Sequence, residues 1–68
     1  MKEKVQHVIY DNKLEEVYFN NKWQLHRTDG PAVTIYDVNT RNIIEERYYL
    51  NNKEYDVFSY YVKTKKSK

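Results

Sequence analysis

The only glycine and the only proline of this 68-residue chain are neighbours, in the segment His26-Arg27-Thr28-Asp29-Gly30-Pro31-Ala32. Asp-Gly between extended, apolar-rich segments is a strong hairpin signal, because glycine tolerates the positive φ of a tight turn and aspartate can bond the turn backbone. Proline fixes φ and donates no backbone hydrogen bond, so it suits the start of a strand. We therefore expect Gly30 to take a positive φ at a point where the strand direction reverses.

The rest of the chain shows short alternating segments separated by polar breaks, which is typical of strands. The pairs Asn20-Asn21 and Asn51-Asn52 predict two-residue turns, because asparagine tolerates the left-handed conformation better than any residue except glycine. Asp11-Asn12-Lys13 and residues 39–42 are further breaks of hairpin length. The expected strands are residues 5–10, 14–19, 22–27, 32–38, 43–50 and 53–55.

The periodicity changes after residue 55. Asp56 is a residue type that caps helices, and four residues after it fall at i, i+3, i+4 and i+7, the spacing of one helix face. These positions are Val57, Tyr60, Tyr61 and Thr64. The predicted fold class is mainly β: an antiparallel β-meander of five to six strands with a short C-terminal α-helix laid on the sheet.

Charge and size exclude several classes of function. The net charge is +2, but four lysines lie in residues 63–68, and without that tail eight basic side chains face ten acidic ones, a net of −2. A dedicated nucleic-acid binder would carry a basic stripe across its folded body. Two histidines without any cysteine make a zinc site unexpected. We predict no catalytic residue, no metal and no cofactor, because so short a chain rarely encloses a water-excluding pocket.

The chain also lacks the marks of membrane insertion. No apolar run approaches the roughly 20 residues that a membrane span needs. Met1-Lys2-Glu3-Lys4 leads into no apolar signal segment. These features predict a cytoplasmic protein without membrane contact.

Two parts of the chain share an order of motifs. Ile9-Tyr10-Asp11 recurs as Ile35-Tyr36-Asp37, and Tyr18-Phe19-Asn20-Asn21-Lys22 recurs as Tyr49-Leu50-Asn51-Asn52-Lys53. Such a recurrence indicates one supersecondary unit that packs on its neighbour. We expect one domain with a first unit at residues 5–34, a second at 35–55, and the C-terminal helix within 56–66.

This order of motifs resembles the MORN-like β-hairpin repeats, whose pattern is W/Y-x-x-N-G-K-x-x-H-R-x-D-G-P-A and which occur in bacteriophage, giant-virus and bacterial proteins. The resemblance covers about residues 9–55, and its specific part is the stretch from His26 to Ala32. Asn21 and Asn52 stand where the family usually has glycine, which makes these turns costlier. The resemblance implies an antiparallel meander, a viral origin and no catalytic activity, and it names no ligand.

Small size and this resemblance lead to the functional prediction of a non-catalytic binding module. The expected protein is a phage-encoded inhibitor that docks on a host protein of an antiviral defence system, in the host cytoplasm, and blocks it. Aromatic side chains supply rigid contact area at interfaces, so they are the candidate anchors. These are Tyr18, Trp23, Tyr48 and Tyr49. For Trp23 we favour a place in the core, since large aromatic residues dominate small cores.

The polar residues His26, Arg27 and Asp29 are the other binding candidates. Arg27 can pair with a carboxylate or phosphate of a partner through its planar fork. The alternative is structural: Arg27 and Asp29 tie the turn together, and His26 bonds a backbone carbonyl.

Three further functions stay open, and one of them is a purely structural repeat module of a larger assembly that binds no host component. The C-terminal tail can contact phosphates while nearby tyrosines stack on bases, which would make the chain a nucleic-acid binder. The residues concerned are Tyr60, Tyr61, Lys63, Lys65 and Lys66. Alternatively, a symmetric homo-oligomer could sequester a nucleotide signal in a pocket between its subunits.

Overall fold

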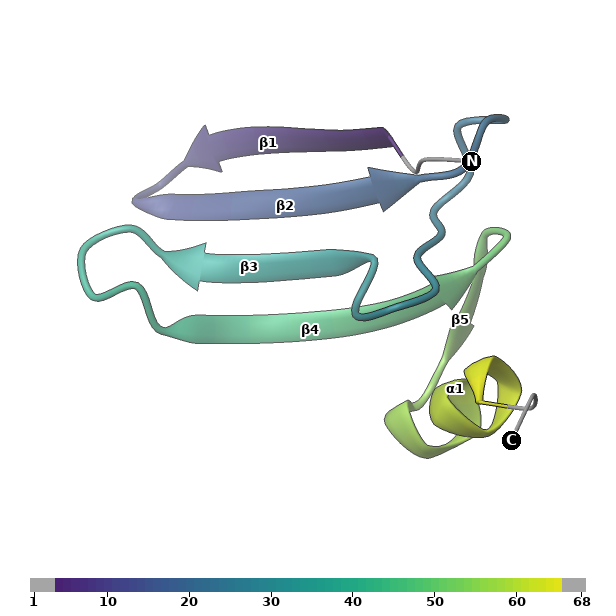
Figure 1. Ribbon diagram of the computed structural model, residues 1–68. Helices are drawn as coiled ribbons and strands as arrows, with labels where there is room; N and C mark the ends of the chain where they lie inside the picture. The colour runs from purple at the N-terminus through teal and green to yellow at the C-terminus, as the bar shows by residue number, and fades with distance from the viewer. Residues whose placement is uncertain (1–3, 66–68) are drawn as a thin grey trace.

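The computed structural model describes residues 4–65. Five strands form one antiparallel sheet in chain order, and a single helix follows them (Figure 1). The elements are β1 (Lys4–Tyr10), β2 (Lys13–Phe19), β3 (Val33–Asp37), β4 (Ile43–Leu50), β5 (Lys53–Tyr55) and α1 (Val57–Thr64). The predicted fold class, a mainly β meander closed by a short C-terminal helix, is confirmed.

Two hairpins are closed by pairs of residues in the left-handed conformation. Asp11 and Asn12, between β1 and β2, have φ of 48° and 61°. Asn51 and Asn52, between β4 and β5, have φ of 51° and 74°. Positive φ at both central residues gives a turn whose twist matches that of the flanking strands. The two-residue turn predicted at Asn51-Asn52 is therefore confirmed. The one predicted at Asn20-Asn21 was wrong, because neither residue has a positive φ and no strand follows at residues 22–27.

The segment between β2 and β3 differs from the prediction. Residues 22–27 form no strand, and Leu25 alone pairs, in an isolated bridge with Phe19. The chain reverses just before this bridge, where Trp23 has a φ of 61°. Gly30 has no positive φ and does not mark a reversal of strand direction, so that prediction was wrong.

The reason is that residues 25–27 occupy the place between β2 and β4 that β3 occupies farther along the sheet. His26 N donates to Tyr18 O at 3.1 Å, and Arg27 N donates to Tyr49 O at 3.2 Å. This segment therefore forms backbone hydrogen bonds with both flanking strands, β2 and β4. The chain then leaves the sheet as a loop, residues 28–31, and returns as β3 (Figure 1). One interrupted element replaces two strands, which gives five strands and not six.

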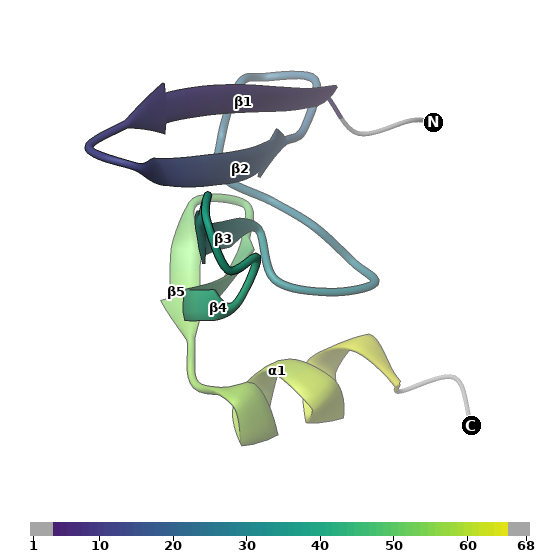
Figure 2. The ribbon, with the colours of Figure 1, turned by 90° about the vertical axis from the view of Figure 1, so that its left-hand side faces the viewer.

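The loop and the helix lie on the same side of the β3–β4–β5 part of the sheet (Figure 2). Figures 1 and 2 place α1 at the edge of the sheet beyond β4 and β5. In the described chain only Ala32, Val33, Thr34 and Tyr60 are buried. Twelve large hydrophobic side chains are exposed. The core formed by the described residues is therefore small even for a domain of this size.

Helix α1 begins after an N-cap made by Asp56. Its Oδ1 accepts from Ser59 N at 2.8 Å. This bond with the Ser59 backbone amide lowers the pKa of the Asp56 carboxyl below its ordinary value. The capping role predicted for Asp56 is confirmed.

Acid is expected to weaken this cap. Because the pKa of Asp56 is lower in the folded state, its stabilising contribution is present above the unfolded-state pKa of about 3.9 and is lost as the pH falls through the folded-state pKa. The helical far-UV circular dichroism signal of the natural chain should therefore decrease below about pH 4 more than that of Asp56→Asn, which caps without titrating. Identical acid profiles for the two proteins would contradict this role.

Candidate functional site

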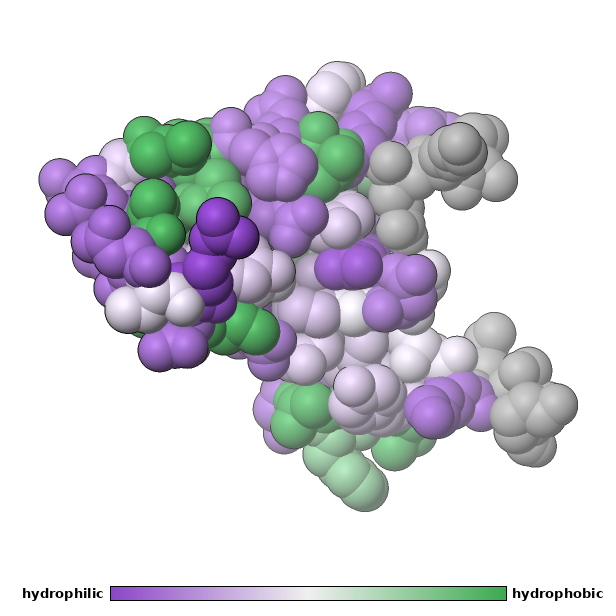
Figure 3. All heavy atoms as spheres, turned by 60° about the vertical axis from the view of Figure 1, so that its left-hand side comes forward, coloured by the Kyte–Doolittle hydropathy of each residue, from purple (hydrophilic) through white to green (hydrophobic). Residues whose placement is uncertain are grey.

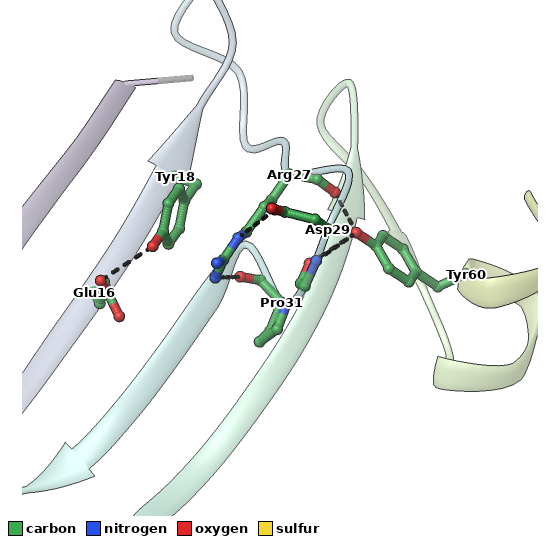
Figure 4. Close-up of polar contacts among 7 residues, drawn as sticks. Glu16, Tyr18, Arg27, Asp29, Pro31 and Tyr60 are labelled. Atoms are coloured by element: carbon green, nitrogen blue, oxygen red, sulfur yellow. Dashed lines mark hydrogen bonds and ion pairs between the residues drawn. The ribbon is translucent and has the colours of Figure 1, made fainter. Parts of the chain in front are cut away.

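Tyr60 connects the helix to the loop that precedes β3. The side chain is 1% exposed, and its hydroxyl reaches the backbone of the loop (Figure 4). The hydroxyl oxygen accepts a hydrogen bond from Gly30 N at 3.1 Å. Its single proton can be donated to either of two backbone carbonyl oxygens. These are Gly30 O, at 2.8 Å, and Arg27 O. The ring packs on Tyr48, with centroids 4.7 Å apart. Tyr60 therefore holds both α1 and the loop in place.

Arg27 directly precedes the same loop, and its side chain contacts two residues of it. Its guanidinium carbon is 3.9 Å from the centroid of the Tyr18 ring, Nε donates to Asp29 Oδ1 at 3.0 Å, and Nη1 donates to Pro31 O at 3.3 Å (Figure 4). Burial works to lower the pKa of Arg27, but the hydrogen bond with Asp29 and the electrostatic effects of Tyr18, Asp29 and Glu16 together outweigh it, so the pKa lies above its ordinary value. Arg27 and Asp29 thus tie the turn together, as in the structural alternative above.

Gly30 is explained by the close approach of Arg27. A Cβ at position 30 would lie 3.1 Å from the guanidinium carbon, tighter than ordinary van der Waals contact. Glycine therefore leaves room for the guanidinium group that binds the loop, and its positive-φ freedom is not used.

His26 and Asn20 join the segment between β2 and β3 to the β4–β5 turn. His26 Nδ1 accepts from the backbone amide of Asn51 at 3.0 Å. Asn20 Oδ1 accepts from Lys22 N and Gln24 N at 2.8 and 3.0 Å, and its Nδ2 donates to Asn51 Oδ1 at 3.1 Å. Sequence reasoning missed this role of Asn20. Its only signal was the recurrence that aligned Asn20 with Asn51.

Glu16 is a second polar centre that sequence reasoning did not single out. Its carboxylate lies 3.3 Å from His7 Nε2 and accepts from the hydroxyls of Tyr18 at 3.2 Å and Tyr36 at 3.5 Å. Burial raises the pKa of the Tyr18 hydroxyl. The positive charge of Arg27 lowers this pKa and the negative charge of Glu16 raises it, and the result lies above the ordinary value. Within residues 4–65 no group of three or more metal-ligating side chains comes together.

Trp23 lies on the surface and not in the core, so the preferred core placement was wrong. Its side chain is 56% exposed. One side of the ring packs against Phe19, with centroids 5.4 Å apart, and Lys4 Nζ lies 5.1 Å from the ring centroid. A positive φ is a costly conformation for so bulky a residue. Strain of this kind is frequent at binding sites.

The other predicted anchors are part of the internal packing. Tyr48 is half-buried and lies against Tyr60 and Tyr61. Burial raises the pKa of the Tyr48 hydroxyl, and the charge of Glu46 adds to the effect. Tyr49 is also half-buried, and its hydroxyl donates to Glu54 Oε1 at 3.4 Å.

The residues predicted for nucleic-acid binding are only partly accessible. Tyr60 is buried and cannot stack on a base, so that role was wrong. Tyr61 is 45% exposed, with Lys65 Nζ 5.7 Å from its ring centroid. Lys63 Nζ lies 5.8 Å from the ring of Tyr55. Lys66, the last residue of the set, is outside the described residues.

Exposed hydrophobic side chains gather at two places (Figure 3). One is the end of the sheet that holds the β1–β2 turn, where a pocket of about 240 Å³ opens between Ile9, Leu14, Tyr36, Asp37, Val38 and Arg41. The other is α1, where Phe58 is 75% exposed. Its other exposed hydrophobic residues are Val57, Tyr61 and Val62.

No family model, curated protein or solved structure matches this chain. Kinship with the MORN-like repeats therefore stays a prediction from the motif in residues 26–32. No helix within residues 4–65 has the length and apolar character needed to cross a membrane.

Proposed function

We propose that this chain is a non-catalytic protein-binding module that docks on another protein through the outer side of α1. The observation that supports the proposal is the exposure of Phe58 and Val62, one turn apart, on a helix whose inner side already buries Tyr60. A helix with hydrophobic residues on both sides is expected to be buried on both sides. The sheet covers one side of α1, so a partner covers the other.

The side chains on the outer side of α1 indicate what kind of surface the partner presents. Phe58, Tyr61 and Val62 have i, i+3 and i+4 spacing, which gives one continuous strip that an apolar groove can receive. Large aromatic side chains in such a groove carry a disproportionate share of the binding energy. Lys63 and Lys65 lie in or next to the last turn of the helix. We therefore expect a protein groove with apolar walls and an acidic rim.

The finer proposal is that the partner is a host defence protein and that this chain is a phage-encoded inhibitor of it. This proposal rests on the small size of the chain and on the resemblance of residues 26–32 to the MORN-like repeats. Inhibition by occlusion needs only a stable surface and no reacting group. Trp23 is a second candidate anchor, because its exposed ring is held in place by Phe19 and Lys4.

The decisive experiment is affinity capture from a bacterial lysate, with and without nuclease, using the natural chain, Phe58→Ala and Ser59→Ala. Ser59 is the exposed neighbour of Phe58 on α1, so Ser59→Ala is the matched control. A captured protein that survives nuclease should bind Phe58→Ala at least about tenfold more weakly, which is ~1.4 kcal/mol. It should bind Ser59→Ala as it binds the natural chain.

Other outcomes separate the alternatives. Equal binding of Phe58→Ala, with loss for Trp23→Ala, would move the docking surface to Trp23 and overturn the role of α1. Retention that disappears with nuclease would favour nucleic-acid binding through the lysine tail. An empty column would contradict the inhibitor proposal for that host.

A further inference from the structure

Strand β1 has an open outer edge. It is the first strand of the sheet order, seven residues long, and within residues 4–65 no segment pairs with its outer side. A long unpaired edge is a template for another strand, and natural proteins usually protect such edges with charges, proline, bulges or short length. The opposite edge has this protection, because β5 has three residues that include Lys53 and Glu54. β1 pairs with β2 without any bulge.

The β1–β2 turn determines which backbone groups point to this open edge. Asp11 and Asn12 form a two-residue turn that joins Tyr10 to its direct partner Lys13. In such a hairpin the closing pair exchanges both of its hydrogen bonds, and the bonded pairs then alternate along the ladder. Every second residue back from Tyr10 therefore bonds β2. The N–H and C=O groups that point outward belong to Val5, His7 and Ile9.

From this arrangement we infer that two copies of the chain pair through β1, antiparallel, about a two-fold axis at His7. The outward residues are symmetric about His7, so the axis sets Val5 against Ile9 of the partner subunit and the two His7 residues against each other. Each such pair exchanges two backbone hydrogen bonds, about six in all. No outward group of Val5, His7 or Ile9 remains unbonded in this register.

The side chains fit the same register. Ile9 is 72% exposed, and Val5 is also exposed. In the dimer each Val5 lies against Ile9 of the partner subunit, so the interface holds two such pairs of β-branched residues. On the other face Val8 lies against Gln6 of the partner subunit. The one charged residue of β1, Lys4, lies against Tyr10 and not against another lysine. An identical strand therefore satisfies both the backbone and the side chains, which is the reason to assign a second copy and not a foreign strand.

This interface is separate from the surface in the proposed function, because it uses β1 and leaves Phe58 on α1 free. Dimerisation and partner capture can therefore fail or succeed independently. A Phe58→Ala chain should still form the dimer.

The test is the mass of the full chain in solution, measured by sedimentation equilibrium over a range of concentrations. The mass should approach twice the 8.4 kDa of the chain and fall toward 8.4 kDa on dilution. His7→Pro removes one outward N–H and spares the β1–β2 ladder, so it should remain folded and stay monomeric. His7→Ala removes the side chain but keeps the N–H, so it should dimerise like the natural chain.

A dimeric His7→Pro protein, or a natural chain that is monomeric at every concentration, would overturn the inference. Amide hydrogen exchange provides a second measurement in case His7→Pro fails to fold. Exchange at Val5, His7 and Ile9 should slow at least about tenfold with rising protein concentration, while Gln6 and Val8 stay protected throughout. Concentration-independent exchange at the three outward amides would also contradict the dimer.

Discussion

Tyr60→Phe is expected to lower the free energy of unfolding by about 2 kcal/mol, although it removes a single oxygen atom. The reason is that the hydroxyl is buried with the loop backbone, where it accepts from Gly30 N and donates to a carbonyl of Gly30 or Arg27. Without it these half-buried backbone groups lose a partner beside the fully buried Tyr60 ring. Their desolvation is then not compensated.

Urea denaturation measures this effect, and the matched control is the next residue. Tyr61→Phe removes the same atom from a side chain that is 45% exposed, so it should change the free energy of unfolding by less than about 0.5 kcal/mol. Tyr60→Ala also removes the ring and should cost about 3–5 kcal/mol, which is comparable to the whole stability of a chain this small. Equal effects of Tyr60→Phe and Tyr61→Phe would show that Tyr60 does not hold the loop.

Asn20→Ala is expected to be the second most damaging of the polar substitutions, at about 2 kcal/mol. The Asn20 side chain accepts two backbone amides of its own turn and donates to Asn51 and Gln24. Its loss releases the reversal after β2 and the contact of this reversal with the β4–β5 turn. The free energy of unfolding should fall, and protection of the Gln24 amide from hydrogen exchange should fall with it.

Two variants separate these contributions. Asn20→Asp keeps the oxygen that accepts the two amides but loses both donated bonds, so it should cost about half as much as Asn20→Ala. Asn21→Ala changes an exposed neighbour and should be close to neutral. If Asn20→Ala proved as mild as Asn21→Ala, the network around Asn20 would not stabilise the fold.

Five of the six strands and the turn at Asn51-Asn52 could be predicted because they depend on short-range properties of the chain. Alternation of apolar and polar residues follows from the two faces of a strand, and the turn at Asn51-Asn52 depends on the left-handed tolerance of these two residues. The Asp56 cap is equally local. Each of these signals acts within a few residues, so it can be recognised before any tertiary contact is known.

The candidate site was predicted less well, because its residues depend on distant partners. Trp23 looked like a core residue by its size, yet the reversal after β2 places it on the surface. Tyr60 looked like one of several helix-face tyrosines, yet it alone meets the loop 30 residues earlier in the chain. Nothing in the local pattern distinguishes Tyr60 from Tyr61.

The amino-acid sequence by itself determined the meander, the turn at Asn51-Asn52 and the capped helix, since alternation, left-handed tolerance and capping are local preferences. Only the tertiary structure decided the conformation of residues 22–32 and the strands with which they pair. Gly30 takes no positive φ there, and its missing Cβ leaves room for the Arg27 side chain that folds back over the loop. Within residues 4–65 the same structure leaves the outer edge of β1 and the outer side of α1 uncovered, which no local pattern of the sequence could show.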